Sequence, residues 1–420
     1  GRIRSGDLVR LPMGPVPVTL IEALAARRDE LRDVTVWQGS CRHPHPWRVG
    51  DPSWTGHVQV VSDFLSPMLR AGMDARTTDF AVTDYALAER VRDCGRRDSF
   101  AADVFFGLVT EPDAEGYVTF GYSLWHTRAL LQAARLKVAE IGRGMITPCG
   151  NTRIHLSEFD LLVDQEKPPV LVPPPSLSDE RIEVTEVIGA YVSTLVEDGD
   201  TLQVGTGTLS SCMGSYLTEK NDLGLDAEIL VASTIELVKS GVASGKYKTY
   251  RPGIATGSFI VPGADFAFCD RNPGIELHDI QWCNDVTRIA GIRNLIAINQ
   301  GSMIDLTGQV ASESIGPAMF TGPGGQLNWM MGALYAPGGR SVLVLPSTAR
   351  QGSVSRIVPE LAPGTLVTVP RPYVDTVITE HGMANLQGLT QRQRSEALIE
   401  LAHPDFRSEL AAVARGRFWP

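Results

Sequence analysis

Short apolar runs rich in β-branched residues alternate with helical patterns along the whole chain of 420 residues. The runs are residues 34–36, 58–61, 104–106, 137–141, 202–204, 229–231, 295–298, 341–345 and 366–369. Helical patterns separate them, for example at residues 19–33 and 124–136. Because consecutive parallel strands need a long crossover connection, usually a helix, this alternation predicts an α/β fold with parallel sheets covered by helices.

A proline-rich stretch divides the chain. Residues 167–175 contain five prolines, and each proline removes a backbone donor and fixes φ, so a helix does not continue through this stretch. A helical pattern begins again after it and runs to residue 195. With 43% hydrophobic residues, the chain is long enough for two domains with cores of their own. We predict an N-terminal domain at residues 1–172 and a C-terminal domain at residues 173–420.

The charge of the chain is acidic and evenly spread. There are 38 basic and 48 acidic residues, a net charge of −10, without long runs of one sign. Nucleic-acid binding needs clustered Lys and Arg and is therefore not expected, whereas a small anionic ligand needs only a local basic patch. No segment has the length of a membrane span, and the first thirty residues lack the apolar core of a signal peptide.

The cysteines and histidines give no strong metal signal. Six cysteines lie at positions 41, 94, 149, 212, 269 and 283, with no pair at a C-x-x-C spacing. This pattern suggests neither a structural zinc site nor a disulfide framework. His43 and His45, with Asp51 and His57 nearby, could form a cluster, but histidines two residues apart in a proline-flanked loop do not reliably face one way. We predict no metal and a reducing, cytoplasmic location.

Two stretches together suggest acyl chemistry. Residues 200–207 run from a strand into a Gly-Thr-Gly turn, and Glu228 stands in the apolar run 225–231. A carboxylate in such a run must be desolvated, paired or functional, because an uncompensated buried charge is costly. Backbone N–H groups at a glycine turn can stabilise an oxyanion, so the two stretches suggest a carboxylate nucleophile attacking an acyl group. Taken singly, the glutamate could be structural and the glycine turn could be only a turn.

A resemblance to a known family runs along nearly the whole chain. The matching segments, in order, are residues 5–9, 33–36, 139–141, 155–160 and 205–207, then Glu228, Asn284 and Asn299, then residues 304–310, 313–316, 322–326, 355–359, 377–382 and 402–407. One such match would be chance, but so many in the family's order are not. The chain resembles the acetyl-CoA hydrolase/transferase family of class I CoA-transferases, and it is most similar in character to 4-hydroxybutyrate CoA-transferase.

The resemblance implies a fold, a reaction and a partner set. The fold would be two related, open, mostly parallel-sheet α/β domains of the class I CoA-transferase (NagB/RpiA-like) type, with the site in the cleft between them. The reaction would move CoA between an acyl-CoA and a carboxylic acid through an acyl-glutamyl anhydride and a glutamyl-CoA thioester. Acyl-CoA would be a substrate, with no permanently bound cofactor, and the protein would be a homodimer. Trp47 and Trp54 would line the cleft or a subunit contact.

The resemblance also assigns roles to residues. Glu228 would be the nucleophile, and the backbone amides of Thr206 and Gly325 would hold the oxyanion, each such donor typically contributing roughly 3–4 kcal/mol in the transition state. Asn284 would be a neutral donor beside the nucleophile, and Glu380 a polar partner shaping the pocket. The expected substrate- and CoA-binding residues are Gly205, Gly207, Asn299, Gly322, Gly324 and Gln326. Without the family resemblance, Asn284 is equally consistent with a turn residue and Glu380 with a helix start.

Three segments depart from the family's usual pattern. Residues 226–228 lack the His-Ser or His-Thr that often precedes the glutamate, and residues 232–235 replace the usual Ser-Asp-Gly. Residues 326–331 lack the common Asp, aromatic and Arg residues. These changes leave two alternatives beside the CoA-transferase, namely an acyl-CoA hydrolase or divergent acyltransferase, and a CoA-binding protein without catalysis.

Overall fold

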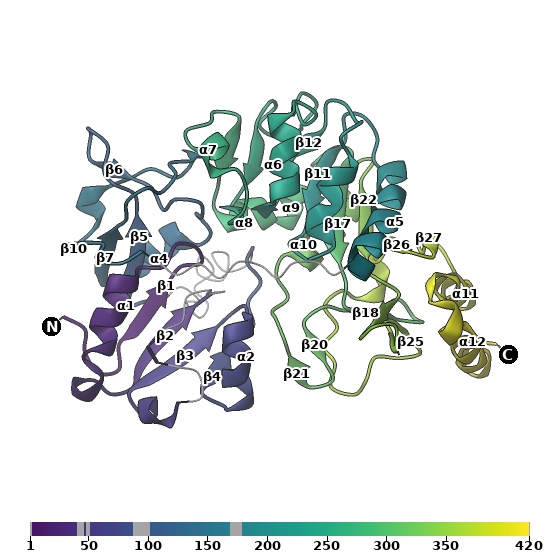
Figure 1. Cartoon of the computed structure of the whole chain (residues 1–420), viewed down its shortest axis with the longest axis horizontal. Helices are drawn as coiled ribbons and strands as arrows, with labels where there is room; N and C mark the ends of the chain where they lie inside the picture. Colours follow the sequence, from purple (N-terminus) through teal and green to yellow (C-terminus); the bar gives the residue numbers. More distant parts are fainter. Residues whose placement is uncertain (1, 40–45, 48–50, 87–100, 169–178, 420) are drawn as a thin grey trace. The chain divides into compact units, whose positions relative to one another are not determined.

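The computed structural model describes residues 2–39, 46–47, 51–86, 101–168 and 179–419, which fold into two compact units (Figure 1). The first unit comprises Gly1–Pro174, Thr256–Cys283 and Phe320–Gly322, and the second comprises Pro175–Ala255, Asn284–Met319 and Pro323–Pro420. The boundary expected at residues 172 and 173 lies outside the described residues. The first unit is built from three separate stretches, two of which come from the half of the chain expected to form the C-terminal domain.

The first unit contains a seven-stranded parallel sheet. Its strands, in spatial order, are β10 (Leu161–Asp164), β7 (Leu136–Ile141), β5 (Val104–Val109), β1 (Leu8–Leu11), β2 (Val34–Gln38), β3 (Val58–Ser62) and β4 (Thr78–Phe80). Every neighbouring pair is parallel. The helices α1 (Val18–Ala25), α2 (Pro67–Asp74) and α4 (Thr127–Ala133) belong to the crossovers. The four strands predicted before residue 142 are confirmed, and the strand order reverses between β1 and β5.

The second unit contains a six-stranded sheet. Its strands, in spatial order, are β12 (Gly224–Leu225), β11 (Thr201–Val204), β17 (Leu295–Gln300), β22 (Arg340–Val344), β26 (Thr376–Thr379) and β27 (Gly382–Asn385). All pairs are parallel except the last, which is antiparallel. Every residue of β11 and β26 is buried, as expected for parallel strands with both faces covered. The runs predicted at 202–204, 295–298 and 341–345 are confirmed as strands of this sheet.

The prediction of a strand at residues 366–369 is wrong. Leu366 and Val367 are 42% and 41% exposed, and the backbone N–H of Leu366 donates to the Ser314 hydroxyl at 2.8 Å. Strand β26 pairs with β22 instead. The run is apolar enough for a strand, but within the described chain it makes only an isolated bridge, between the buried Val369 and Val310, and local composition does not reveal that pairing.

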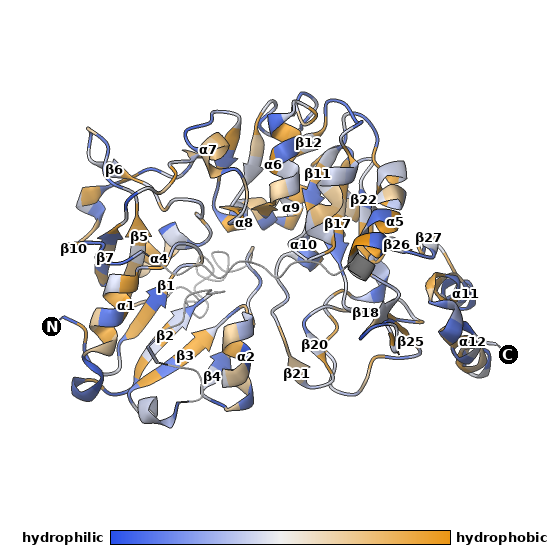
Figure 2. Ribbon diagram, viewed as in Figure 1, coloured by the Kyte–Doolittle hydropathy of each residue, from blue (hydrophilic) through white to orange (hydrophobic). Residues whose placement is uncertain are grey.

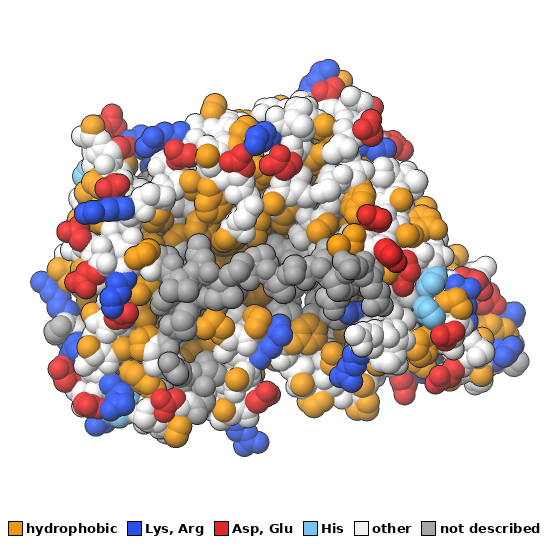
Figure 3. Space-filling model, viewed as in Figure 1, with side chains coloured by type: hydrophobic (Ala, Val, Ile, Leu, Met, Phe, Trp, Pro, Cys, Tyr) orange, Lys and Arg blue, Asp and Glu red, His pale blue; other side chains and the backbone are white. Residues whose placement is uncertain are grey.

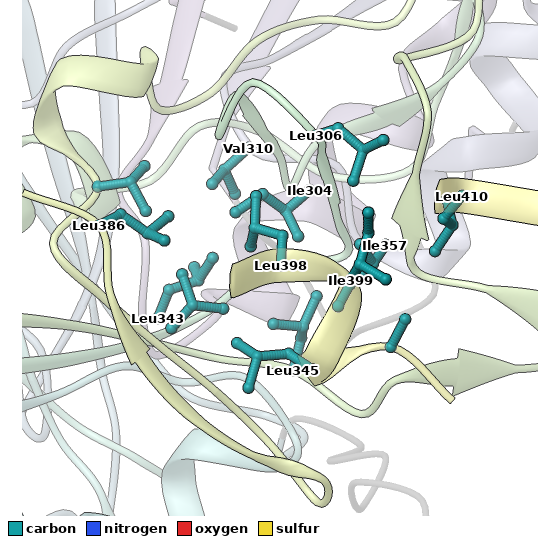
Figure 4. Close-up of a cluster of buried hydrophobic side chains, with 14 of the residues drawn as sticks. Ile304, Leu306, Val310, Leu343, Leu345, Ile357, Leu386, Leu398, Ile399 and Leu410 are labelled. Atoms are coloured by element: carbon teal, nitrogen blue, oxygen red, sulfur yellow. The ribbon is translucent and has the colours of Figure 1, made fainter. Parts of the chain in front are cut away.

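Helices pack behind the second sheet around a continuous apolar core. The C-terminal helices α11 (Gln391–Leu401) and α12 (Pro404–Phe418) contribute Leu398, Ile399 and Leu410 to a cluster with residues that include Leu343 and Leu345 (Figure 4). In Figure 2 the hydrophobic colours concentrate on the strands, and α11 and α12 show much blue. This pattern is that of outer helices that bury one face and expose the other.

The charged side chains on the surface are distributed as the sequence predicts. On the face shown in Figure 3, acidic and basic side chains are interspersed rather than gathered by sign. Within the part of the chain that the structure describes, no helix combines the length and apolar character that a membrane crossing requires.

One aspartate should make the stability of the fold pH-dependent. Asp63 follows β3, and burial of its carboxyl group raises its pKa to about 6, although the charge of Arg10 acts in the opposite direction. The folded state then holds this proton at pH values where the unfolded state has lost it, so stability falls as the pH rises from about 4 to about 6. For Asp63→Asn we expect a gain in unfolding free energy that is about 1 to 2 kcal/mol larger at pH 8 than at pH 5.

Urea unfolding of both proteins at the two pH values measures this difference. Asp164→Asn, at the exposed end of β10, removes the same charge without removing a buried carboxyl group and serves as the control. A gain that is equal at both pH values would contradict the prediction.

Candidate active site

The candidate residues of the second unit gather at one edge of its sheet. The turn beginning at Gly205 follows β11, Gln300 ends β17, Ser347 follows β22 and Glu380 follows β26. Because parallel strands run in one direction, their carboxyl ends share an edge, and ligands of open α/β sheets bind at this edge. The fold therefore brings together segments that are far apart in the chain.

Glu228 lies where the chain leaves the sheet. The backbone N–H of Asp226 donates to the Leu202 carbonyl at 3.0 Å, which continues the ladder of β12, and the chain then bends at Glu228 before the short strand β13 (Ile229–Leu230). The residues on both sides are buried, whereas Glu228 itself is half-buried. The bend directs the Glu228 carboxylate away from its apolar neighbours, so this carboxylate is only partly desolvated.

Asn284 holds this carboxylate. It ends helix α8 (Ile280–Asn284), is fully buried, and its Nδ2 donates to Glu228 Oε2 at 2.6 Å. Its Oδ1 accepts from Trp329 Nε1 at 3.0 Å. An indole N–H can only donate, so Trp329 determines which end of the amide faces Glu228. The bond is that of a neutral donor on a carboxylate, and it leaves the negative charge in place.

The backbone of Gly325 packs against the same carboxylate. It is the N-cap of helix α10 (Gln326–Tyr335), with φ −95° and ψ 10°. A Cβ built on Gly325 would overlap both Glu228 Oε2 and Asn284 Nδ2. A residue with a side chain does not fit here, and the positive end of the α10 dipole is a favourable place for a carboxylate. Glu228, Asn284 and Gly325 therefore form one contact group.

Helix packing holds this contact group in place. A buried cluster joins α10 to helix α9 (Val286–Ile289) and to β17 through Trp329, Ala333, Ile289 and Leu295. Both residues that border Glu228 therefore adjoin elements anchored in one core, because Asn284 ends α8 two residues before α9 begins and Gly325 is the N-cap of α10. A site on such elements is held more precisely than one on a long loop.

Chains similar to this one are named as CoA-transferases. It is 38% identical over 317 residues to 4-hydroxybutyrate coenzyme A transferase of Clostridium kluyveri, an alignment that covers 75% of this chain and 73% of that protein. It is 34% identical over 415 residues, 98% of this chain and 92% of the relative, to succinyl-CoA:cyclohexane-1-carboxylate CoA transferase of Geobacter metallireducens. Residues 264–414 match the family model for the acetyl-CoA hydrolase/transferase C-terminal domain. This chain belongs to the acetyl-CoA hydrolase/transferase family.

Solved structures agree with this membership. RipA from Yersinia pestis superimposes with a TM-score of 0.89 at 29% identity, covering 99% of this chain and 95% of that one. The 4-hydroxybutyrate CoA-transferase from Porphyromonas gingivalis gives 0.79 at 29% identity, covering 99% and 94%. The expected class I CoA-transferase fold is confirmed.

The glycine turn of this family member is packed on two sides. The N–H of Gly205 donates to the Ile298 carbonyl at 2.9 Å, and the Ser210 hydroxyl donates to the carbonyls of Gly205 and Gly207 at 2.9 and 3.3 Å. Thr206, between them, is exposed. The turn therefore holds Thr206 at the carboxyl edge of the sheet, where its N–H was expected to serve as an oxyanion donor.

Neighbouring residues of the predicted binding set have side-chain partners. Asn299 and Gln203 are buried and exchange two amide hydrogen bonds, at 2.8 and 3.4 Å. Gln326 Nε2 donates to the Gln300 carbonyl at 3.3 Å. Gly324, which immediately precedes Gly325, has φ +58°, a backbone conformation that favours glycine.

Glu380 forms a contact group with Ser347. The backbone N–H of Ser347 donates to Glu380 Oε2 at 2.8 Å, and its hydroxyl donates to Oε1 at 2.5 Å. His381 Nε2 lies 3.7 Å from Oε1, and burial lowers the pKa of this imidazole despite the raising effect of Glu380. These hydrogen bonds connect the loop after β22 with the loop after β26.

Two further groups of predicted residues lie in the first unit. A Cβ on Gly322 would meet the Asp63 carbonyl oxygen at 2.7 Å, so this glycine packs against the chain after β3. Trp47 and Trp54 pack edge to face, with ring centroids 6.1 Å apart, and line a cavity of about 300 Å³.

The possible metal cluster rests largely on residues that the structure does not describe, because His43 and His45 lie outside the described ranges. His57 Nδ1 faces the carbonyl oxygens of Arg28 and Leu31 at 2.6 and 3.0 Å. In the described part of the chain, no three His, Cys, Asp or Glu side chains are grouped so that they could hold a metal ion.

Sequence reasoning missed Trp329. A tryptophan in an apolar helical pattern is most simply interpreted as a core residue, and Trp329 is indeed fully buried. Its partner Asn284 lies 45 positions earlier in the chain, so no local spacing could have revealed the bond. The resemblance assigns a role to Gln326 in this helix but none to Trp329.

Proposed function

We propose that this chain is a CoA-transferase that moves CoA between an acyl-CoA and a carboxylic acid, with Glu228 as the nucleophile. The observation that carries the proposal is the contact group in which Asn284 and Gly325 border the half-buried Glu228 carboxylate. A carboxylate that is held by a neutral donor is suited to attack a carbonyl. The names of the relatives support the same reaction.

The proposed sequence begins with the carboxylate of Glu228 attacking the thioester carbonyl. The carbon–sulfur bond breaks, which gives an acyl-glutamyl anhydride and the CoA thiolate. The thiolate then attacks the glutamyl carbonyl, which forms a glutamyl-CoA thioester and releases the first acid as its carboxylate. A second carboxylate attacks that thioester, and the returning thiolate takes the new acyl group and restores Glu228. No net proton or electron is consumed.

Each step passes through a tetrahedral oxyanion, for which we assign the N–H groups of Thr206 and Gly325. Two features support these donors. Thr206 is exposed at the carboxyl end of β11, and Gly325 touches the nucleophile itself. Preorganised backbone donors stabilise charge as it develops, because they need no rearrangement during the reaction. Asn284 would keep Glu228 oriented through all four steps.

We also propose the substrates, the location and the assembly state of this enzyme. Acyl-CoA and a small carboxylic acid are its substrates, and the chemistry itself requires no permanently bound cofactor, because the glutamate carries the acyl group and then CoA. The protein acts in the cytoplasm. It assembles as a homodimer, which sedimentation of the purified protein would test.

Mass spectrometry tests the central step. After incubation with a panel of acyl-CoAs, the wild-type protein should carry a CoA adduct on the peptide that contains Glu228. Borohydride or hydroxylamine should inactivate the enzyme only after acyl-CoA has been added, because a glutamyl thioester is far more electrophilic than a carboxylate. Inactivation that is equally fast without acyl-CoA would contradict the covalent intermediate.

The acceptor separates the transferase from its alternatives. A transferase conserves the thioester and needs a carboxylic acid, whereas a hydrolase consumes thioester in water alone. Exchange of labelled CoA into a second acid, with constant total thioester, is the expected result. Net loss of thioester without an acid would favour the hydrolase.

A further inference from the structure

A buried ion pair lies two residues from Glu228. Asp226 Oδ1 accepts from Arg288 Nη2 at 2.5 Å, and the side chains of Asp226 and Arg288 are 1% and 8% exposed. Asp226 comes from the segment that leaves β12, and Arg288 from α9. The two residues are 62 positions apart in the chain, so the tertiary fold alone pairs them.

Lys248 adds a second buried cation to the pair. Its side chain is 0% exposed, and its Nζ lies 3.9 Å from Asp226 Oδ2. The same Nζ donates to the carbonyls of Leu225 and Ile254 at 2.6 and 2.5 Å. Lys248 therefore binds both the side chain of Asp226 and the peptide group immediately before it. The backbone that leads into Glu228 is held on two successive residues.

The ion pair and the bond to the nucleophile join the same two segments. Asp226 and Glu228 are two residues apart in one segment, and Asn284 and Arg288 are four residues apart in the other. Asp226 contacts Arg288, and Glu228 contacts Asn284. A displacement of one segment along the other would break both contacts together. An ion pair with a hydrogen-bonding guanidinium is directional, whereas apolar packing of similar volume would allow such a displacement.

We infer that Asp226 and Arg288, with Lys248, are positioning residues that hold Glu228 against Asn284 and Gly325. The inference rests on the proposed role of Glu228. Its consequence is that damage to the ion pair misplaces the nucleophile by a fraction of an ångström while the sheet stays folded. A misplacement near 1 Å can lower a reaction rate about 10²-fold.

The second unit offers a matched control. Asp200 Oδ1 accepts from Arg340 Nη2 at 2.6 Å, and Asp200 is also nearly fully buried. Asp200 precedes β11 and Arg340 begins β22, so this ion pair lies at the amino edge of the sheet that carries the site on its carboxyl edge. Its removal should affect stability without moving Glu228.

Steady-state kinetics of matched variants is the first arm of the test. For Asp226→Asn and Arg288→Gln we expect kcat per folded molecule to fall about 10- to 100-fold, with the KM for acyl-CoA changed less than about 3-fold. The double variant should be less impaired than Asp226→Asn alone, because it removes the Arg288 cation together with its carboxylate, whereas the single variant leaves both Arg288 and Lys248 without that carboxylate. Asp200→Asn and Arg340→Gln should keep kcat within about 2-fold of wild type. Wild-type kcat in the first two variants, or equal losses in the controls, would overturn the inference.

Fluorine NMR of protein labelled with 5-fluorotryptophan is the second arm, and it needs no turnover. The Trp329 signal, assigned with Trp329→Phe, reports on the bond to Asn284. Asp226→Asn and Arg288→Gln should shift this signal, and Asp200→Asn should not; an unshifted signal in both site variants would overturn the inference. If the wild-type protein exchanges no CoA, the proposed function fails, and this arm still decides whether the ion pair positions the site.

Discussion

Replacing Glu228 with glutamine should lower turnover by at least about 10³-fold, because it removes the attacking oxygen anion. The fold should hardly change. Glutamine has nearly the same shape, and its side-chain oxygen can still accept the hydrogen bond from Asn284 Nδ2, which measures 2.6 Å in the wild type. Coupled assays of CoA exchange measure the effect, and circular dichroism and thermal unfolding check the fold.

Glu236→Gln is the appropriate control for this variant. Glu236 is exposed on helix α6 (Ala232–Lys239), which begins four residues after Glu228, and its replacement should leave turnover within about 2-fold of wild type. The Glu228→Gln protein should also lack the CoA adduct. If it retained more than about a tenth of wild-type turnover, Glu228 could not be the nucleophile, and the transferase mechanism proposed above would fail.

Gly325→Ala should lower kcat by about 10²-fold or more and change the KM for acyl-CoA much less. The added methyl group would overlap Glu228 Oε2 and Asn284 Nδ2, so it displaces the proposed nucleophile together with the amide that holds it. The loss should therefore appear in the chemical step. Rapid-mixing measurements of adduct formation separate this step from acyl-CoA binding.

Gly416→Ala is the appropriate control for Gly325→Ala. Gly322, which is nearby in the sequence, is unsuitable because its Cβ would lie 2.7 Å from the Asp63 carbonyl oxygen. Gly416 lies in α12, and a Cβ added to it would meet no atom within 4 Å. Gly416→Ala should therefore keep full activity and raise stability by about 0.5–1 kcal/mol. Weaker acyl-CoA binding at unchanged kcat in Gly325→Ala would show that this loop only packs against the substrate.

Much of the fold was predictable, because the signals that specify it are local. Parallel strands buried on both faces are continuous apolar runs, and most of the predicted runs are strands of the two sheets. There are two exceptions. Residues 229–231 contain β13, which belongs to neither of these sheets, and the run at residues 366–369 shows the limit of such signals. An apolar run of the right length forms a strand only if a partner strand is available, and here β26 pairs with β22 in its place.

The candidate site was predictable in part. The order of motifs placed Glu228, Asn284 and Gly325 at the reacting centre, and the structure brings these three residues into contact. The same reasoning grouped Glu380 with them, whereas its carboxylate is held by Ser347. A motif identifies the type of residue at a position, but the partner of a side chain depends on the neighbouring segments of the fold.

The sequence by itself determined the α/β class and the family, and it singled out Glu228 as the candidate nucleophile, because strand patterns and motif residues are properties of single short segments. Only the tertiary structure decided that Thr256–Cys283 belongs to the first unit, that Trp329 orients Asn284, and that Asp226 pairs with Arg288. The two side-chain pairs join positions 45 and 62 residues apart. Such contacts form only when packing of the helices and sheet brings distant segments together, and no local periodicity encodes them.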